Sequence, residues 1–155
     1  MTDPAVSRRP EQLSIAVRSG TELTSAELYA LLRLRVDVFV VEQECPYPEL
    51  DGRDLLPDTR HVWATTSDDR VAGCLRVLAE EGGVQRIGRV CTARFARGTG
   101  VGAVLMREAL ELIGDTESVL DAQTYATGFY ERFGFRPEGE EFLEDGIPHV
   151  TMRRR

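Results

Sequence analysis

The amino-acid sequence predicts a mixed α/β (α+β) domain with a mostly antiparallel central sheet and helices on both faces. Two strand-like runs, at residues 61–66 and 71–78, flank a polar turn and predict a hairpin, which a third run at 87–92 extends into a meander. A segment of helical periodicity then separates this third run from another strand at 119–122, as in a β-α-β crossover. Antiparallel strands followed by a crossover require a mixed sheet.

The N-terminal third of the chain predicts a strand, a capped helix and a long loop. Residues 13–18 alternate as in a strand, and Thr24 and Glu27 have the spacing of a capping box, which marks the start of a helix. The apolar face of this helix is predicted to carry Leu28, Leu31, Leu32, Val36 and Phe39. Residues 44–58 contain three prolines and a glycine, and loops of this length are often functional.

The C-terminal half predicts two helices and a closing hairpin. The first helix rests on apolar residues spaced four, four and three apart, namely Val101, Leu105, Ala109 and Leu112. A short helix is expected at 127–132. A hairpin follows, with one arm from Phe135 onward, the turn residues at 144–146 and the second arm at 149–152.

Length and composition favour one domain that spans residues 1–155. The first 12 residues are polar and contain prolines, so we expect a flexible N-terminal segment rather than a signal peptide. No apolar run approaches the roughly 18 residues of a membrane span. The expected protein is therefore cytoplasmic and has no membrane partner.

The spacing of the three cysteines argues against disulfide and zinc roles. Cys45, Cys74 and Cys91 are odd in number and lack metal-binding or redox spacing, so we expect neither a disulfide nor a metal site. Cys74 and Cys91 lie inside strand-like runs, where a cysteine most often serves as a small buried side chain.

Charge is distributed unevenly along the chain. The net charge of −7 argues against a nucleic-acid surface. Residues 82–107 contain five arginines and no carboxylate, whereas residues 40–58 contain six carboxylates and one arginine. Such runs often form ordinary solvated faces. They are also what a protein would need in order to hold a polyanionic cofactor at one pole and attract a cationic substrate to the other.

The segment Arg97-Gly98-Thr99-Gly100-Val101-Gly102 has the features of a pyrophosphate-binding site. Glycines let the backbone approach a ligand closely, and the free N–H groups in the first turn of the following helix point at an anion. Arg97 can add a charge-assisted hydrogen bond. The simpler interpretation of these glycines is a turn.

Two other nucleotide motifs fit this segment less well. A P-loop needs a lysine after its last glycine, and the chain contains no lysine. A dinucleotide fingerprint fits Gly98, Gly100 and Ala103, with Asp121 about 20 residues later, but its first glycine should directly follow a strand. Here residues 93–97 intervene, so dinucleotide binding is the weaker hypothesis.

Two motifs together resemble the GNAT superfamily of N-acetyltransferases. Arg97, Gly100 and Gly102 match its [Q/R]-x-x-G-x-[G/A] pattern, and residues 129–135, with the sequence FYERFGF, resemble its F-Y-x-x-x-G-F segment. The segment at 34–43, the Asp51-Gly52 loop and the DGIPH run at 145–149 are similar to the ElaA branch.

The resemblance implies a single GNAT-like domain whose sheet splays open to admit acetyl-CoA. Val90, Cys91 and Thr92 would lie on the strand that pairs with the pantetheine arm, and backbone N–H groups of Thr99 to Gly102 would bind the pyrophosphate. Phe129 would also belong to the cofactor site. Gln123 stands where many relatives have an asparagine that contacts the pantetheine, so this contact departs from the family pattern.

The resemblance also implies direct transfer, in which an amine attacks the thioester carbonyl and the coenzyme A thiolate leaves. Tyr130 matches the position of the general acid that protonates this thiolate. The base is less defined by the sequence. Glu42, Glu44, His61 and His149 are all chemically able to accept a proton, and we favour Glu42 because it ends a helical segment near the acidic loop.

We therefore expect an acetyl-CoA-dependent N-acetyltransferase that acts on a primary amine of a cationic small molecule or peptide, without a metal. The alternative is a non-catalytic acetyl-CoA-binding module that regulates a partner. The sequence leaves the acceptor open and is compatible with a homodimer.

Overall fold

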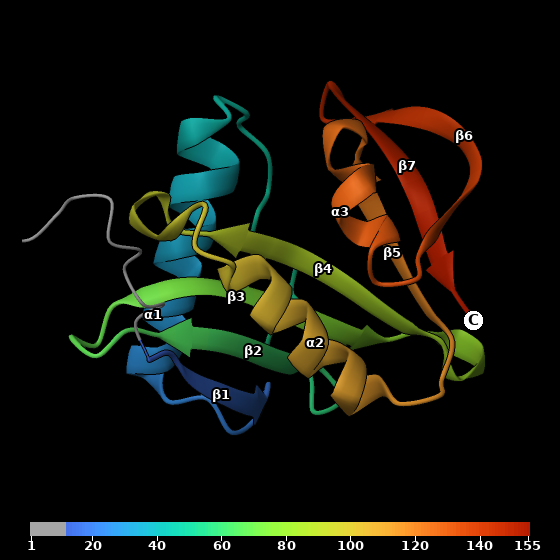
Figure 1. The fold of residues 1–155 in the computed structure, drawn as a ribbon. Coiled ribbons are helices and arrows are strands. Elements are labelled where there is room, and N and C mark those ends of the chain that lie inside the picture. Colours follow the sequence, from blue (N-terminus) through green and yellow to red (C-terminus); the bar gives the residue numbers. More distant parts are fainter. Residues whose placement is uncertain (1–11) are drawn as a thin grey trace, which may run out of the picture.

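The computed structural model of the protein describes residues 12–155, which form a layered α/β arrangement (Figure 1). The expected N-terminal segment 1–12 lies, apart from Gln12, outside the described residues. Within them the strands are β1 (Ser14–Ser19), β2 (Arg60–Thr65), β3 (Val71–Ala79), β4 (Gln85–Thr92), β5 (Ser118–Gln123), β6 (Arg136–Glu144) and β7 (Ile147–Arg154). The helices are α1 (Ser25–Val36), α2 (Val101–Ile113) and α3 (Thr127–Glu131). No described helix is both long and apolar enough to cross a bilayer.

The seven described strands form one mixed sheet in the order β1-β2-β3-β4-β5-β7-β6. All neighbouring pairs are antiparallel except β4 and β5. These two are parallel and pair only at their first residues, Gln85 with Ser118 and Arg86 with Val119. Beyond this point they diverge, and Figure 1 shows the gap that opens between them. The predicted mixed sheet and its splay are therefore both present.

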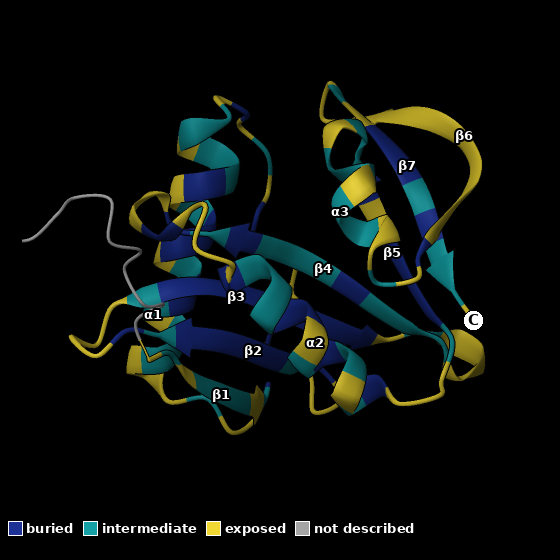
Figure 2. Ribbon diagram, in the orientation of Figure 1, coloured by how far each residue is buried: buried dark blue, intermediate teal, exposed yellow. Residues whose placement is uncertain are grey.

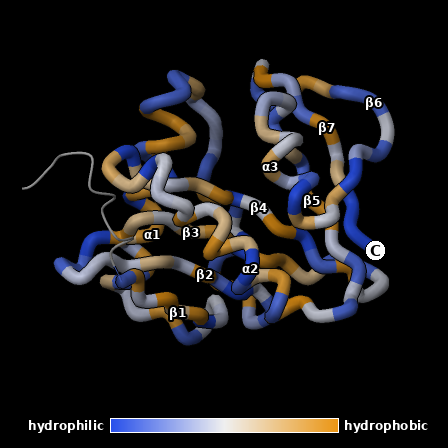
Figure 3. Tube along the Cα trace, in the orientation of Figure 1, coloured by the Kyte–Doolittle hydropathy of each residue, from blue (hydrophilic) through white to orange (hydrophobic). Residues whose placement is uncertain are grey.

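Helices cover both faces of the sheet, as predicted. On one face α2 packs against β2, β3 and β4, and its Leu105 and Met106 join a core that includes Val62 and Val77. Aromatic residues of α3 pack against this same core. On the other face α1 places Leu31 and Leu34 against Trp63. The central strands are buried in Figure 2, and hydrophobic residues concentrate in them and in α2 in Figure 3.

The start of α1 follows the sequence prediction, but its buried face differs. Thr24 and Glu27 form the predicted capping box, with reciprocal hydrogen bonds of 3.1 and 2.9 Å. The buried residues, however, are Leu31, Leu34 and Arg35 rather than the whole predicted leucine stripe. Arg35 can be buried because acidic residues from a distant loop neutralise it.

A π-helical segment at Asp37–Glu42 continues α1 without a break. Such segments are rare and often lie at functional sites. The chain then enters the predicted loop, residues 44–58, which contains no helix or strand. The start of this loop meets the C-terminal hairpin, where the Cys45 thiol donates a hydrogen bond of 3.3 Å to the carbonyl of Asp145.

Candidate active site

A cavity of about 1230 Å³ lies where β4 and β5 diverge. Its walls come from β4, the start of α2, the end of β5, α3, the loop after α1 and the turn between β6 and β7. All of the predicted site residues except Thr99 line this cavity, namely Glu42, Val90, Cys91, Thr92, Arg97, Gly98, Gly100, Val101, Gly102, Gln123, Phe129 and Tyr130. Thr99 lies between two lining glycines, and its hydroxyl donates to the carbonyl of Ala96. The fold thus brings together residues that are far apart in the sequence.

The glycine segment starts α2 in the way that an anion site requires. Gly98 and Gly100 have positive φ angles of +76° and +86°, and a Cβ at either position would meet no described atom within 4 Å. Glycine is therefore needed there for backbone conformation rather than for space. Gly100 is the N-cap of α2, and no described side chain caps this helix. The first N–H groups of α2 are consequently available to a ligand.

Gly102 has a different physical role. It is helical, and a Cβ built there would lie 3.3 Å from the ring of Phe129. The absence of a side chain lets α3 approach the first turn of α2 closely. Both predicted motifs therefore meet at one contact, since Gly102 belongs to the glycine segment and Phe129 to the aromatic segment.

β4 forms the cavity wall that faces β5, and this strand contains a bulge. Between the paired positions Cys74–Cys91 and Arg76–Gly88, β4 has one residue more than β3. Arg89 lies within this bulge and has a φ of 53°. Bulges bend a strand and increase its twist, which fits the separation of β4 from β5. Beyond Arg86 the β5-facing edge of β4 has no strand partner among the described residues, so it can pair with an extended ligand.

Tyr130 is held on α3 by aromatic contacts. Its ring lies 5.0 Å from Phe129 and 6.5 Å from Phe135, both in edge-to-face geometry. Burial raises the pKa of the Tyr130 phenol above its ordinary value, and the nearby Tyr125 and Cys91 raise it further. The phenol therefore keeps its proton at neutral pH and can act as a donor but not as a base.

The cysteines match the structural role predicted for them. Cys74 and Cys91 are buried partners on β3 and β4, with their sulfur atoms 3.6 Å apart. The contact with Cys74 and burial both raise the pKa of the Cys91 thiol. Because thiolate is the nucleophilic form, Cys91 is poorly suited to attack a thioester even though it lines the cavity.

Glu42 and Arg97, which the sequence assigned to different tasks, form an ion pair. The Arg97 guanidinium donates to the Glu42 carboxylate at 2.5 Å and to the carbonyl of Thr92 at 3.2 Å. Arg94 is a more distant partner of the same carboxylate, at 3.9 Å. This pair connects the π-helical segment to the glycine segment. The carboxylate proposed as a base is therefore engaged by a cation.

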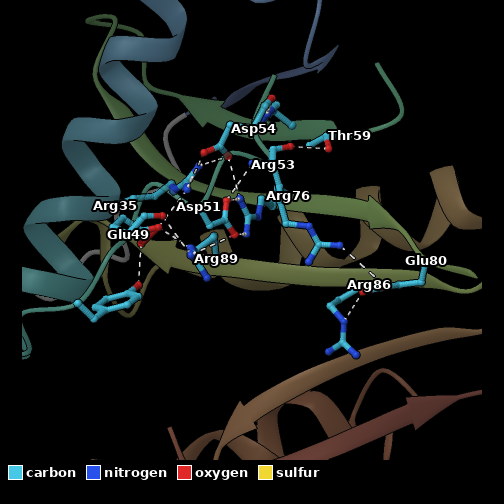
Figure 4. A network of polar contacts seen from close by, with 12 residues as sticks. Arg35, Glu49, Asp51, Arg53, Asp54, Thr59, Arg76, Glu80, Arg86 and Arg89 are labelled. Atoms are coloured by element: carbon cyan, nitrogen blue, oxygen red, sulfur yellow. Dashed lines mark hydrogen bonds and ion pairs between the residues drawn. The ribbon is translucent and has the colours of Figure 1, made fainter. Parts of the chain in front are cut away.

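The predicted separation into a cationic and an anionic pole is wrong. Figure 4 shows that the acidic loop folds onto the arginines in one network of ion pairs. Arg35 bonds to Asp54 at 2.7 Å and to Glu49 at 3.0 Å, with each of these side chains at most 9% exposed. The remaining contacts join Asp51 and Asp54 to Arg76, and Glu49 to Arg89. Three of the five loop carboxylates thus neutralise buried or half-buried arginines.

These ion pairs fix the charge states of the loop. Hydrogen bonds from Arg76 hold the pKa of Asp51 well below its ordinary value, despite partial burial. Burial would raise the pKa of Asp54, but Arg35 and Arg76 together lower it. The loop is anchored by charge, and only two exposed carboxylates, Glu44 and Asp58, lie outside this network, so most of the acidic run is not free to attract a cationic acceptor.

The fold brings some of the candidate bases to the cavity and leaves others away from it. His61 is buried away from the cavity, and its Nε2 lies 2.8 Å from the carbonyl oxygen of Asp54. Glu44 is exposed and does not line the cavity. His149 lines it and is a register partner of Gln123, whose side-chain amide donates to Gln43 at 3.4 Å. Only Glu42 and His149 of the four therefore reach the site.

Sequence reasoning missed several residues of the cavity wall. Gln43, Tyr47, Arg53, Arg76 and Arg86 line it. Gln43 and Arg86 belong to segments that the sequence singled out, but no pattern assigned any of the five to a site, since they come from separate segments. The hairpin residues Glu144, Asp145 and Ile147 also line it and were predicted only as a turn or as part of a family motif. Within the described residues no cluster of side chains is suited to a metal ion.

Comparison with known proteins gives one consistent answer. Residues 36–155 match the family model of the acetyltransferase (GNAT) domain. A UPF0039 protein of Mycobacterium tuberculosis is 54% identical over 136 residues, covering 86% of this chain and 87% of the other. The ElaA protein of Escherichia coli is 44% identical over 140 residues, covering 86% and 91% of the two chains.

Solved structures agree with these relatives. An acyl-CoA N-acyltransferase from Pseudomonas aeruginosa superposes with a TM-score of 0.88 and 43% identity, over 93% of this chain and all of that one. The crystal structure of Escherichia coli ElaA gives a TM-score of 0.87 and 39% identity over the same shares of the two chains. The chain therefore belongs to the GNAT acetyltransferase family and to its ElaA-like branch.

Proposed function

We propose that this protein transfers the acetyl group of acetyl-CoA to a primary amine, by direct attack in a ternary complex. One observation supports this proposal above the others. The cavity between β4 and β5 has an uncapped helix N-terminus at one side and a protonated phenol, Tyr130, at another. An anion-binding group and a proton donor in one cavity suit a substrate that carries phosphates and releases a thiolate.

The residues present fit coenzyme A. The N–H groups at the start of α2, from Val101 to Ala103, and the guanidinium of Arg97 can take the pyrophosphate. The unpaired edge of β4 from Ile87 to Thr92 offers backbone groups to an extended arm, as an added strand would use them. The acyl thioester would supply an activated carbonyl group.

The protein's own groups then act on the atoms that change bonds. The uncharged amine nitrogen forms a bond to the acyl carbon, and the carbon–sulfur bond breaks. Tyr130 donates its proton to the departing sulfur. The attacking nitrogen loses one proton as it becomes the amide nitrogen, and this proton restores the phenol. Backbone N–H groups on β4 near the bulge are suited to stabilise the oxyanion.

The structure changes what the acceptor should look like. Because Glu49, Asp51 and Asp54 are paired internally, the argument for a cationic acceptor loses its main support. The proposal therefore specifies a primary amine and places no further demand on its charge.

A thiol-release assay tests the proposal. Purified protein is incubated with acetyl-CoA and a panel of amines that includes small aliphatic amines, amino acids and short peptides, and free coenzyme A is measured with a thiol reagent. We expect release that depends on both the amine and the protein. Calorimetric binding of acetyl-CoA with no release across the panel would instead support a non-catalytic binding module.

A further inference from the structure

His149 and Tyr130 line the same cavity from opposite faces of the sheet. On β7, Val150 and Met152 join the core under α2, and Tyr130 packs against that core. Since successive side chains of a strand alternate between faces, His149 points to the other face, the one on which α1 lies. A proton donor and an imidazole therefore approach the cavity from its two sides.

The tautomer of His149 follows from one hydrogen bond. Its Nδ1 lies 2.7 Å from the carbonyl oxygen of Ile147. A carbonyl oxygen only accepts, so Nδ1 carries the hydrogen in this contact. In a neutral imidazole the second nitrogen, Nε2, then has a free lone pair and can accept a proton.

The surroundings of the ring place this nitrogen near a carboxylate. His149 stacks on Phe142, with ring centroids 5.9 Å apart and planes inclined by 22°, and only 8% of the residue is exposed. Its Nε2 lies 3.8 Å from a carboxylate oxygen of Glu144. This distance is too long for a good hydrogen bond, and the two groups form an ion pair only when the imidazole carries a second proton. Glu144 is itself 55% exposed, so it connects the ring to solvent.

The other candidate bases either lie outside the cavity or are engaged by a cation. His61 is buried outside the cavity, Glu44 does not reach it, and the Glu42 carboxylate is bound by Arg97. We infer that His149 is the base of this reaction. Its Nε2 accepts one proton from the incoming ammonium, directly or through one water. This inference rests on the proposed acetyl transfer. It gives His149 the role of base that the sequence analysis assigned to Glu42.

The proton balance is closed by the groups present. An ammonium acceptor has three protons on nitrogen, and the amide product has one. His149 takes the first and passes it to solvent beside Glu144. The second balances the proton that Tyr130 gives to sulfur. Acetyl-CoA and an ammonium ion thus yield an amide, a thiol and one released proton.

A variant that spares the structural hydrogen bond separates the base from a packing role. His149→Asn keeps an amide donor near the position of Nδ1 for the Ile147 carbonyl and removes Nε2. Glu44→Gln is the matched control, because Glu44 is exposed and does not line the cavity. Thiol release from acetyl-CoA is measured near neutral pH with n-butylamine, which is protonated there, and with methoxyamine, which is not.

With n-butylamine we expect His149→Asn to lower the rate on the order of 10²-fold, since general acid–base catalysis contributes about 10²- to 10⁴-fold. With methoxyamine, which needs no deprotonation before attack, the loss should shrink to less than about tenfold. Glu44→Gln should resemble the wild type with both amines. A damaged fold would instead reduce both rates equally, and an equal loss or no loss overturns the assignment.

The two proposals fail in different ways. If wild-type protein releases no thiol with any amine, the transfer and the base are both overturned. If wild-type protein is active and His149→Asn is equally active with n-butylamine, only the role of His149 is overturned.

Nitrogen NMR of the imidazole rings gives a readout that does not depend on activity. The chain has two histidines, so the His149→Asn spectrum assigns both sets of signals. We expect wild-type His149, in its neutral form, to carry its hydrogen on Nδ1. A neutral ring with the hydrogen on Nε2 would overturn the assignment even if the variant proved unstable.

Discussion

The Arg97 guanidinium donates a hydrogen bond of 2.5 Å to the carboxylate of Glu42, which lies 55 positions earlier in the chain. The contact joins the end of the π-helical segment to the glycine segment that starts α2. It also sets up a competition, because the proposed function assigns Arg97 to the pyrophosphate of coenzyme A. Any anion bound there must share Arg97 with Glu42 or displace it.

This competition predicts opposite effects on affinity. Arg97→Ala should weaken acetyl-CoA binding by about 10- to 100-fold, because a hydrogen bond to a charged group is worth about 1.5–3 kcal/mol. Glu42→Gln should leave binding unchanged or strengthen it by up to about fivefold, since half-exposed ion pairs are worth at most about 1 kcal/mol. Calorimetry measures both affinities. Arg107→Ala, an exposed position on α2, controls for the change in net charge.

The same variant of Glu42 addresses its predicted catalytic role. If Glu42 is the base, Glu42→Gln should lower the rate of thiol release while affinity is kept. If the carboxylate only holds Arg97, the rate at saturating acetyl-CoA should change little. Weaker binding in both Glu42→Gln and Arg97→Ala would contradict the competition.

Tyr130→Phe should lower the rate of thiol release by about 10²-fold or more and leave acetyl-CoA affinity unchanged, because only the hydroxyl is lost from a packed ring. Burial raises the pKa of this phenol above about 10, the ordinary value for tyrosine. The acid form is the one that donates, so the rate should not fall through loss of this proton between pH 7 and about pH 10. A falling limb in this range that disappears in Tyr130→Phe would disprove the assignment. Tyr29→Phe, an exposed position on α1, is the control.

Gly100→Ala should reduce the free energy of unfolding by about 1–2 kcal/mol, since a Cβ is unfavourable at its φ of +86°. It should also weaken acetyl-CoA binding, because the strain falls on the first turn of α2. Gly128→Ala is the matched control: this glycine lies within α3, has no positive φ, and has open space around its Cβ position. There alanine should be neutral or stabilise by up to about 1 kcal/mol, as measured by chemical denaturation. Equal effects of the two substitutions would show that backbone conformation at Gly100 is unimportant.

Arg35→Met should destabilise the fold by about 3–5 kcal/mol, because Glu49 and Asp54 would be left buried with less compensating charge. Most of this loss of stability comes from leaving the two carboxylates buried without a cation, rather than from the absence of the ion pairs themselves. Adding Asp54→Asn to Arg35→Met should therefore recover part of the stability. Chemical denaturation of the single and double variants measures this, and a strictly additive loss would argue against the explanation.

Particular residues show how far the sequence could predict this protein. The capping box at Thr24 and Glu27 and the glycines that start α2 act within a few positions, so the helix starts that they predict are confirmed. Arg35 was not predicted to be buried, because its partners lie 14 and 19 positions away in a loop without regular structure. The charge map failed for the same reason, since opposite charges that are separated along the chain meet in the fold.

The order of the elements and the mixed sheet could be predicted from periodicity, caps and turn residues, which are local properties, and the family from two short motifs. The folded chain was needed to see which charges remain free, which histidine reaches the cavity and how Glu42 meets Arg97. Those outcomes depend on contacts between distant segments, where burial and the pairing of strands place side chains that no local pattern connects.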